Sequence, residues 1–173
     1  MKNLVITGAS SGIGQATAAA FQTAGYNVIN LSRTPCPEAG VTSIACDLSQ
    51  SNFVQEISAQ LQEQLGGVRE TVLIHNAALL ANDSVSSTDS NELRRIFEIN
   101  LVAPNSLNQL LLPLMDKGSS ILYVGSTLGE KAVPNSFSYV TSKHASIGMM
   151  RATCQDLAGT GIHTACVNPG FTD

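Results

Sequence analysis

The stretch LVITGASSGIG, residues 4–14, joins a short apolar run, a glycine-rich turn and the start of an alanine-rich segment without a break. Leu4-Val5-Ile6 predicts a buried strand, and residues 13–24 predict a helix that Gly25 ends. Glycines in such a turn let backbone N–H groups come close to an anion, and the helix N-terminus adds the positive end of its dipole. The stretch therefore predicts a strand–turn–helix unit that binds a pyrophosphate.

The rest of the chain continues the alternation of short apolar runs with helical patterns. Phe53, Ile57, Leu61 and Leu65 recur at every fourth position, which indicates one buried stripe of a helix. Strands alternating with helices predict one α/β domain over residues 1–173, a doubly wound parallel sheet of Rossmann type with both faces covered. Further strands are expected at 27–31, 41–46, 71–74, 121–124 and 163–167, and a further helix at 138–157.

Composition narrows the partners. The 173 residues include only 13% charged side chains, with a net charge of −4 and no basic tract, so we expect neither nucleic acid nor a membrane as a partner. No apolar run is long enough for a signal peptide or a membrane span, so a cytoplasmic location is expected. The cysteines lack metal-ligand spacing, so we expect reduced, mostly buried thiols and no metal site. They are Cys36, Cys46, Cys154 and Cys166.

The glycine-rich turn also fits a second pattern. Gly8-x-Ser10-x-Gly12 matches the nucleophile elbow of serine hydrolases. That fold needs earlier strands to build an oxyanion hole, and only residues 1–6 precede the turn. We therefore favour dinucleotide binding. The candidate cofactor residues of the turn are Gly8, Ser10, Ser11, Gly12, Ile13 and Gly14.

Arg33 stands just after the second expected strand, where NAD-binding proteins usually carry a carboxylate for the ribose hydroxyl. No carboxylate follows the strand before Glu38, and a guanidinium binds a 2′-phosphate bidentately, with Ser10 as a further donor. We expect NADP(H) to be favoured over NAD(H); the alternative is a solvated surface arginine. Asp47-Leu48 follows the third strand, where Asp47 either accepts from the adenine amino group or caps the next turn.

Tyr139 and Lys143 stand four residues apart in a predicted helix, on one face. An ammonium in that position is expected to lower the pKa of the phenol from its ordinary value of about 10. A phenol tuned in this way exchanges a proton near neutral pH, which suits the proton partner of a hydride transfer. Ser126 precedes this pair along the chain.

In their order along the chain, these features resemble the short-chain dehydrogenase/reductase family. The resemblance rests on the glycine-rich turn, Asp47, Asn76-Ala77, Asn100, Ser126, Tyr139-x-x-x-Lys143 and Asn168-Pro169-Gly170. It implies NAD(P)-dependent oxidation or reduction at a carbonyl or alcohol carbon of a small molecule, by a catalytic tetrad of Asn100, Ser126, Tyr139 and Lys143. It also implies that Asn76, Ala77, Tyr139, Lys143, Pro169 and Gly170 lie beside the cofactor.

The resemblance gives each member of the tetrad a role. The tyrosine protonates the substrate oxygen, the serine orients the carbonyl, and the lysine holds the nicotinamide ribose. Asn100 holds a water that connects the lysine to solvent. Pro104 supports this role, because a proline lacks the N–H that would bond the carbonyl four residues back, which is that of Asn100.

Two positions depart from the usual Asn-Asn-Ala-Gly of the family, since this chain has His75-Asn76-Ala77-Ala78. Ala78 restricts the backbone beside the nicotinamide ribose. We expect His75 to pack at the end of its strand without a catalytic role. The family's next cofactor contact, a threonine, belongs beyond the last residue, and Thr172 stands too early to replace it.

The resemblance also implies a substrate lid, a further helix and a last strand, which would follow Asp173. We expect the chain to be a fragment, a truncated gene product or an incomplete sequence, in which strand 163–167 forms an exposed edge. Two functions stay open: an NADPH-dependent carbonyl reductase, or a nucleotide-binding remnant with poor catalysis. The helices that form the family's dimer contact, at 100–115 and 138–157, are complete, so a homodimer is expected.

Overall fold

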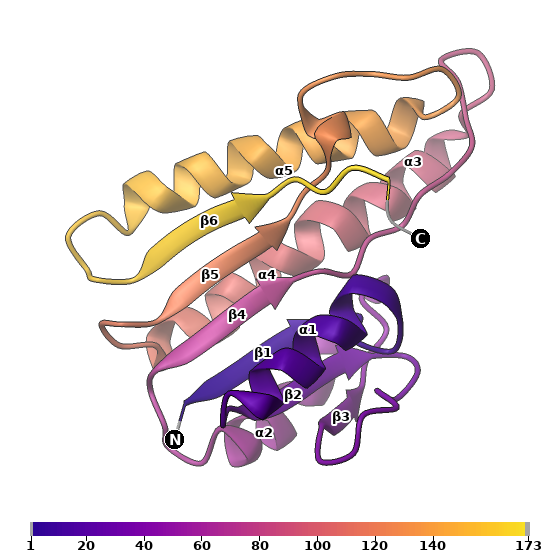
Figure 1. Cartoon of the computed structure of the whole chain (residues 1–173). Coiled ribbons are helices and arrows are strands. Elements are labelled where there is room, and N and C mark those ends of the chain that lie inside the picture. Colours follow the sequence, from indigo (N-terminus) through magenta and orange to yellow (C-terminus); the bar gives the residue numbers. More distant parts are fainter. Residues whose placement is uncertain (1, 172–173) are drawn as a thin grey trace.

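The computed structural model describes residues 2–171, and Thr172 therefore lies outside it. Six parallel strands form one sheet in the order β3-β2-β1-β4-β5-β6 (Figure 1). The chain runs outward from β1 to β3 and then returns to β4, so the order reverses between β1 and β4, where α/β sheets of this kind bind ligands. The strands are β1 (Asn3–Thr7), β2 (Asn27–Ser32), β3 (Thr42–Ala45), β4 (Thr71–His75), β5 (Ser120–Val124) and β6 (His163–Val167).

The helices lie on the two faces of the sheet in unequal number. α1 packs on one face through Ala18 and Phe21, whereas α2, α4 and α5 pack on the other. Within residues 2–171, no helix has the length and apolar character needed to cross a membrane. The helices are α1 (Gly12–Thr23), α2 (Phe53–Leu65), α3 (Ser90–Phe97), α4 (Ala103–Leu111) and α5 (Phe137–Asp156), with a π-helical segment η1 (Glu98–Val102) and short 3-10 turns η2 (Leu112–Leu114) and η3 (Thr127–Gly129).

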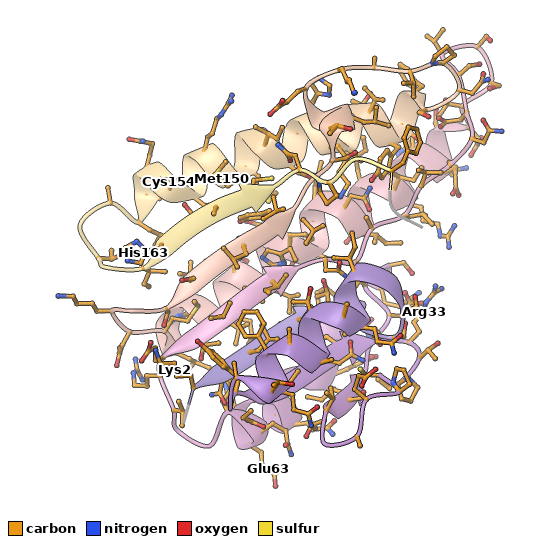
Figure 2. All side chains as sticks on the ribbon, viewed as in Figure 1. Lys2, Arg33, Glu63, Met150, Cys154 and His163 are labelled. Carbon is orange, nitrogen blue, oxygen red and sulfur yellow. The ribbon has the colours of Figure 1, made fainter. Side chains whose placement is uncertain are left out.

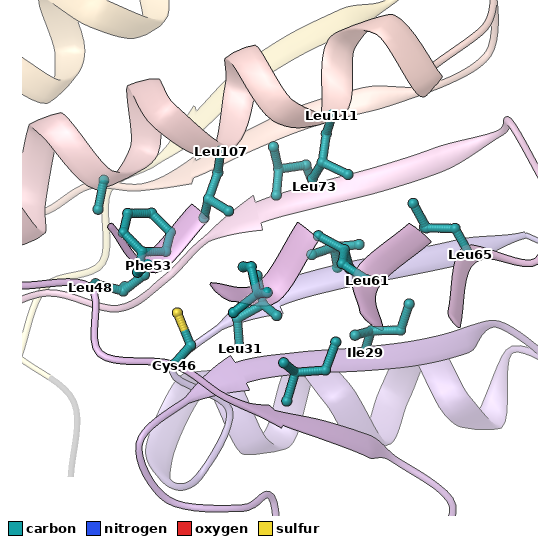
Figure 3. Close-up of a cluster of buried hydrophobic side chains, with 14 of the residues drawn as sticks. Ile29, Leu31, Cys46, Leu48, Phe53, Leu61, Leu65, Leu73, Leu107 and Leu111 are labelled. Carbon is teal, nitrogen blue, oxygen red and sulfur yellow. The ribbon is translucent and has the colours of Figure 1, made fainter. Parts of the chain in front are cut away.

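The larger hydrophobic cluster lies between the sheet and α2 and α4 (Figure 3). The predicted stripe of α2 is confirmed, because all four of its apolar residues are buried in this cluster. They meet Ile29 and Leu31 of β2, while Leu107 and Leu111 of α4 pack over Leu73 of β4. Each such side chain stabilises the fold by about 1.5–3 kcal/mol through its transfer out of water.

The expectation that both faces of the sheet are covered is wrong for β5 and β6. Among the described residues, no helix covers these two strands on the face that carries α1 (Figure 1). None of the five residues of β6 is buried, and Val167 is 59% exposed. β6 forms the predicted edge of the described sheet, beside β5 alone.

The helix that begins after Asp89 changes character along its length. The Asp89 carboxylate accepts from the backbone N–H groups of Asn91 and Glu92, at 2.9 and 3.2 Å, and so caps α3. At η1 the helix widens, and the N–H of Ala103 donates to the carbonyl of Glu98, five residues back. Pro104 then occupies the first turn of α4, where its missing N–H costs nothing.

Candidate dinucleotide cleft and catalytic tetrad

A cleft of about 480 Å³ opens at the carboxyl ends of the central strands, beside the point where the strand order reverses. Its walls are the glycine-rich turn, the ends of β2, β3 and β4, and the junction of α3 with η1. Asp47, which the sequence predicted either to contact adenine or to cap a turn, lines this cleft. Nine further residues that the sequence predicted for the cofactor also line it. The nine are Gly8, Ser10, Ser11, Ile13, Gly14, Arg33, Leu48, Asn76 and Ala77.

The glycine-rich turn has the geometry that an anion needs. Gly8 and Gly12 adopt positive φ angles of 71° and 55°, which side chains disfavour. Space is open where a Cβ on Gly12 would lie, whereas a Cβ on Gly14 would meet the carbonyl oxygen of Gly8 at 2.3 Å. The N-cap of α1, Ser11, makes no side-chain cap, and the first turn holds no acid. The turn and helix end therefore fit a pyrophosphate.

Two asparagines and a threonine hold this turn in place. The Asn76 amide donates to the carbonyl oxygens of Thr7 and Gly8, at 2.9 and 3.0 Å, and so connects the end of β4 to the end of β1. The Thr7 hydroxyl accepts from the N–H groups of Asn76 and Ala77, both at 3.0 Å. Sequence reasoning missed Asn30, a fully buried residue of β2 whose Oδ1 accepts from the N–H of Ala9 at 2.9 Å. An amide side chain in the middle of a largely apolar strand was the available signal.

Arg33 and Asp47 lie at the open end of the cleft. Arg33 is exposed at the edge of the molecule, just beyond β2 (Figure 2). Asp47 accepts from the N–H and the hydroxyl of Ser49, at 3.0 and 2.8 Å, which confirms that it caps the turn before α2. The backbone bond from Ser49 is the main cause of the lowered pKa of Asp47, and the charge of Arg33 adds to it. The contact of Asp47 with adenine stays a prediction.

Ser126, Tyr139 and Lys143 converge at the carboxyl end of β5. The ammonium of Lys143 lies 5.5 Å from the centre of the Tyr139 ring and donates to the carbonyl oxygen of Val124 at 2.8 Å. Ser126 caps η3, its hydroxyl accepting from the N–H of Leu128 at 3.1 Å. The Ser126 hydroxyl lies near enough to the phenol of Tyr139 to lower its pKa. None of the three residues is among those that line the cleft.

The expected lowering of the tyrosine pKa is wrong for this structure. Burial raises the pKa of Tyr139, and the nearby Ser126 hydroxyl opposes the change without reversing it. Burial also acts on Lys143, which is 4% exposed, and lowers its pKa from 10.5 to about 8. Desolvation therefore shifts the pKa values of both Tyr139 and Lys143 toward their neutral forms.

Asn100 links the two parts of the site. Its side chain pairs with the backbone of Leu79 in both directions, accepting from the N–H at 2.8 Å and donating to the carbonyl at 3.0 Å. It also donates to the hydroxyl of Ser142 at 2.9 Å, and this hydroxyl donates to the carbonyl of Tyr139 at 2.8 Å. Asn100 thereby ties the loop after β4, which lines the cleft, to the helix of the tyrosine.

The C-terminal candidates lie beside the serine rather than in the cleft. The carbonyl of Pro169 accepts from the N–H of Thr127 at 2.9 Å, which places Pro169 and Gly170 next to the Ser126 segment. His75 is buried and pairs with Asn108 at 2.8 Å, and burial lowers its pKa to about 4, so the imidazole stays neutral as a packing residue. The sequence reasoning missed other residues that line the cleft. They are Leu31, Ser32, Thr34, Cys46, Leu79, Arg95 and Ile99.

A family model described as short chain dehydrogenase matches residues 2–173 of the chain. The chain belongs to the short-chain dehydrogenase/reductase family. Estradiol 17-beta-dehydrogenase 11 of Mus musculus is 29% identical over 97% of the chain, and the chain spans 61% of the length of this relative.

Solved structures of the family share the fold. The ligand-free aldohexose dehydrogenase of Thermoplasma acidophilum is 30% identical, with a TM-score of 0.88 over 98% of this chain and 66% of its own. A short-chain oxidoreductase of Brucella ovis, in complex with a partially ordered NAD, is 29% identical with a TM-score of 0.88 over 99% of this chain and 84% of its own. The six-stranded parallel sheet is thus that of the family.

Proposed function

We propose that this chain binds NADP(H) and takes part in the reduction of a small carbonyl compound, or the oxidation of the corresponding alcohol. The observation that carries the proposal is the convergence of Ser126, Tyr139 and a buried Lys143 beside a cleft whose turn fits a pyrophosphate. The cofactor would supply the hydride in the reduction and accept it in the oxidation. The chain supplies the anchoring, the orientation and the proton.

Each residue of the tetrad has a task that its contacts suit. Ser126 and Tyr139 present two hydroxyls to one carbonyl oxygen, so that the oxygen is oriented as the phenol gives up its proton. Lys143 keeps its ammonium near the phenol and favours the phenolate that results. Asn100 fixes the helix backbone at Tyr139 through Ser142. We propose that it also holds the water that returns a proton from solvent.

Cofactor choice follows from Arg33, which is exposed on the cleft beside Ser10 and therefore suits a 2′-phosphate. Replacing Arg33 with Asp is expected to reverse the preference for NADPH over NADH, since about 1.5–3 kcal/mol of charged hydrogen bonding is lost. Dissociation constants for both cofactors, measured with the parent chain and the variant at two salt concentrations, test this. Equal affinities in the parent chain would refute the preference.

One observation favours a second candidate function, a nucleotide-binding protein with little turnover. The residues that line the cleft include the predicted cofactor contacts but neither Ser126 nor Tyr139. Turnover of a panel of ketones with NADPH separates the two candidates, because only the first predicts oxidation of the cofactor. The same proposal includes a homodimer through α4 and α5, near which Val102 is 44% exposed, and sizing in solution tests it.

A further inference from the structure

Arg94 and Arg95 are neighbours in α3, but only one of them lines the dinucleotide cleft. Arg95 lies on its wall together with Ile99, four residues later and therefore on the same face of the helix. Arg94 is not among the lining residues and donates instead to the side-chain oxygen of Asn91 at 3.1 Å. Arg95 and Arg33 are the two cationic side chains that line the cleft within residues 2–171.

The wall around Arg95 is apolar, unlike the glycine-rich turn. Ile99 and Ala77 pack against the hydrophobic cluster that contains Leu48, and all three residues line the cleft. Asp47 adds one polar acceptor to the lining of the cleft. A planar, mostly apolar ring that carries an amino group matches this wall, whereas a phosphate would find few donors on it. The chemistry of the wall is therefore that of a nucleobase site.

The ion pair between Arg95 and Glu92 also favours a nucleobase over a phosphate. The carboxylate of Glu92 lies 3.3 Å from its guanidinium, so a doubly charged phosphate approaching Arg95 would be repelled by Glu92. A neutral ring meets no such repulsion. Both side chains are exposed by 40% or more, so their ion pair contributes little and leaves the guanidinium able to turn.

We propose that Arg95 stacks its planar guanidinium on the adenine ring of the bound dinucleotide and so contributes to affinity without choosing between NADH and NADPH. This inference rests on the proposed function. A guanidinium stacks on a π-face through its plane as well as its charge, so lysine does not replace it. The interaction is expected to change affinity about three- to tenfold.

The test is the dissociation constant of NADH, NADPH, ADP-ribose and reduced nicotinamide mononucleotide, measured by titration calorimetry. Arg95→Ala is expected to weaken the first three by the same factor and to leave the mononucleotide, which has no adenine, unchanged. Arg95→Lys is expected to resemble Arg95→Ala, and Arg94→Ala is the matched control that changes none of the four. Thermal unfolding checks that each variant is folded.

The outcomes separate this inference from the proposed function. A loss confined to NADPH, with Arg95→Lys behaving as the parent chain, would assign Arg95 to the phosphate and overturn the stacking role. Unchanged affinities in Arg95→Ala would overturn it as well, while the proposed function would stand because the parent chain binds. A parent chain that binds none of the four ligands would overturn both.

Discussion

Strands β1 and β6 are both five-residue parallel strands of one sheet, yet their surroundings are opposite. Every residue of β1 is buried, and no residue of β6 is. β1 has a strand on each side and helices over both faces, whereas β6 has only β5 beside it and one covered face. The nucleotide half of the molecule around β1 is therefore packed from both faces of the sheet, whereas β5 and β6 are packed by helices from one face only.

The largest expected effect is a loss of turnover, without a loss of cofactor binding, from a substitution in the half around β5 and β6. Tyr139→Phe removes the hydroxyl beside Ser126 and keeps the ring, so turnover is expected to fall by a factor of about 10²–10⁴. Cofactor affinity and the free energy of unfolding should stay nearly unchanged. Steady-state assays with a ketone, together with cofactor titration, measure both. A variant that retains most of the parent turnover would show that another group donates the proton.

A methyl group added to the glycine-rich turn, in the half around β1, should instead weaken cofactor binding. In Gly14→Ala the added Cβ meets the Gly8 carbonyl oxygen at 2.3 Å and the Asn76 amide nitrogen at 2.4 Å, so the turn must shift. We expect a loss of about 1–3 kcal/mol in the free energy of unfolding and a weaker cofactor affinity of at least about tenfold. Urea unfolding and calorimetry measure these quantities.

Gly12→Ala is the matched control for Gly14→Ala. Its Cβ would meet no atom within 4 Å, so only the positive φ of 55° opposes it, at a cost of about 1–2 kcal/mol. Equal effects of the two substitutions on the turn would show that close packing against β4 is not what shapes the nucleotide half.

The buried ammonium of Lys143, in the half around β5 and β6, is expected to lower the free energy of unfolding. Burial lowers the pKa of Lys143 from 10.5 to about 8, so between these pH values the unfolded chain binds more protons and stability rises with pH. Below about pH 8, Lys143 is charged in both the folded and the unfolded chain, and the full free-energy cost of burying its ammonium remains. Lys143→Met is therefore expected to raise the free energy of unfolding by up to about 3 kcal/mol at pH 7, a gain that vanishes near pH 10.5.

Urea unfolding of Lys143→Met at pH 7 and pH 10 measures this gain. The control is Lys131→Met, because Lys131 is exposed and its replacement should change stability little at either pH. A Lys143→Met variant that is less stable than the parent chain at pH 7 would mean that the bond to the Val124 carbonyl outweighs the desolvation of the ammonium.

The smallest effect compares the two strands directly. Val5 of β1 is 0% exposed and Val167 of β6 is 59% exposed. Val5→Ala is expected to lower the free energy of unfolding by about 2 kcal/mol, because it leaves a cavity in a packed core. Val167→Ala should change it by less than about 0.5 kcal/mol. Equal losses in parallel urea titrations would show that β6 is covered in solution by another surface.

The sequence predicted all six strands and the stripe of α2, because apolar periodicity depends on neighbours along the chain. It did not predict the bare face of β5 and β6, because alternation of strands and helices does not say which face each helix covers. Nor did it predict that the pKa of Tyr139 is raised, since spacing along a helix gives proximity but not burial. Arg95 was missed because it lies far along the chain from the turn that it faces across the cleft.

The π-helical segment Glu98–Val102 holds one residue more than an α-helical turn would, within the helix that continues from α3 to α4. Each residue turns a helix by about 100°, so deleting one between Ile96 and Leu107 but outside this segment would rotate α4 by that angle relative to α3. Ile96, before the segment, and Leu107, after it, are both fully buried, and one of them would then leave the core. A one-residue gap in an alignment of relatives therefore belongs inside 98–102 and nowhere else in this helix, and a relative that carries it has lost the local setting of Asn100.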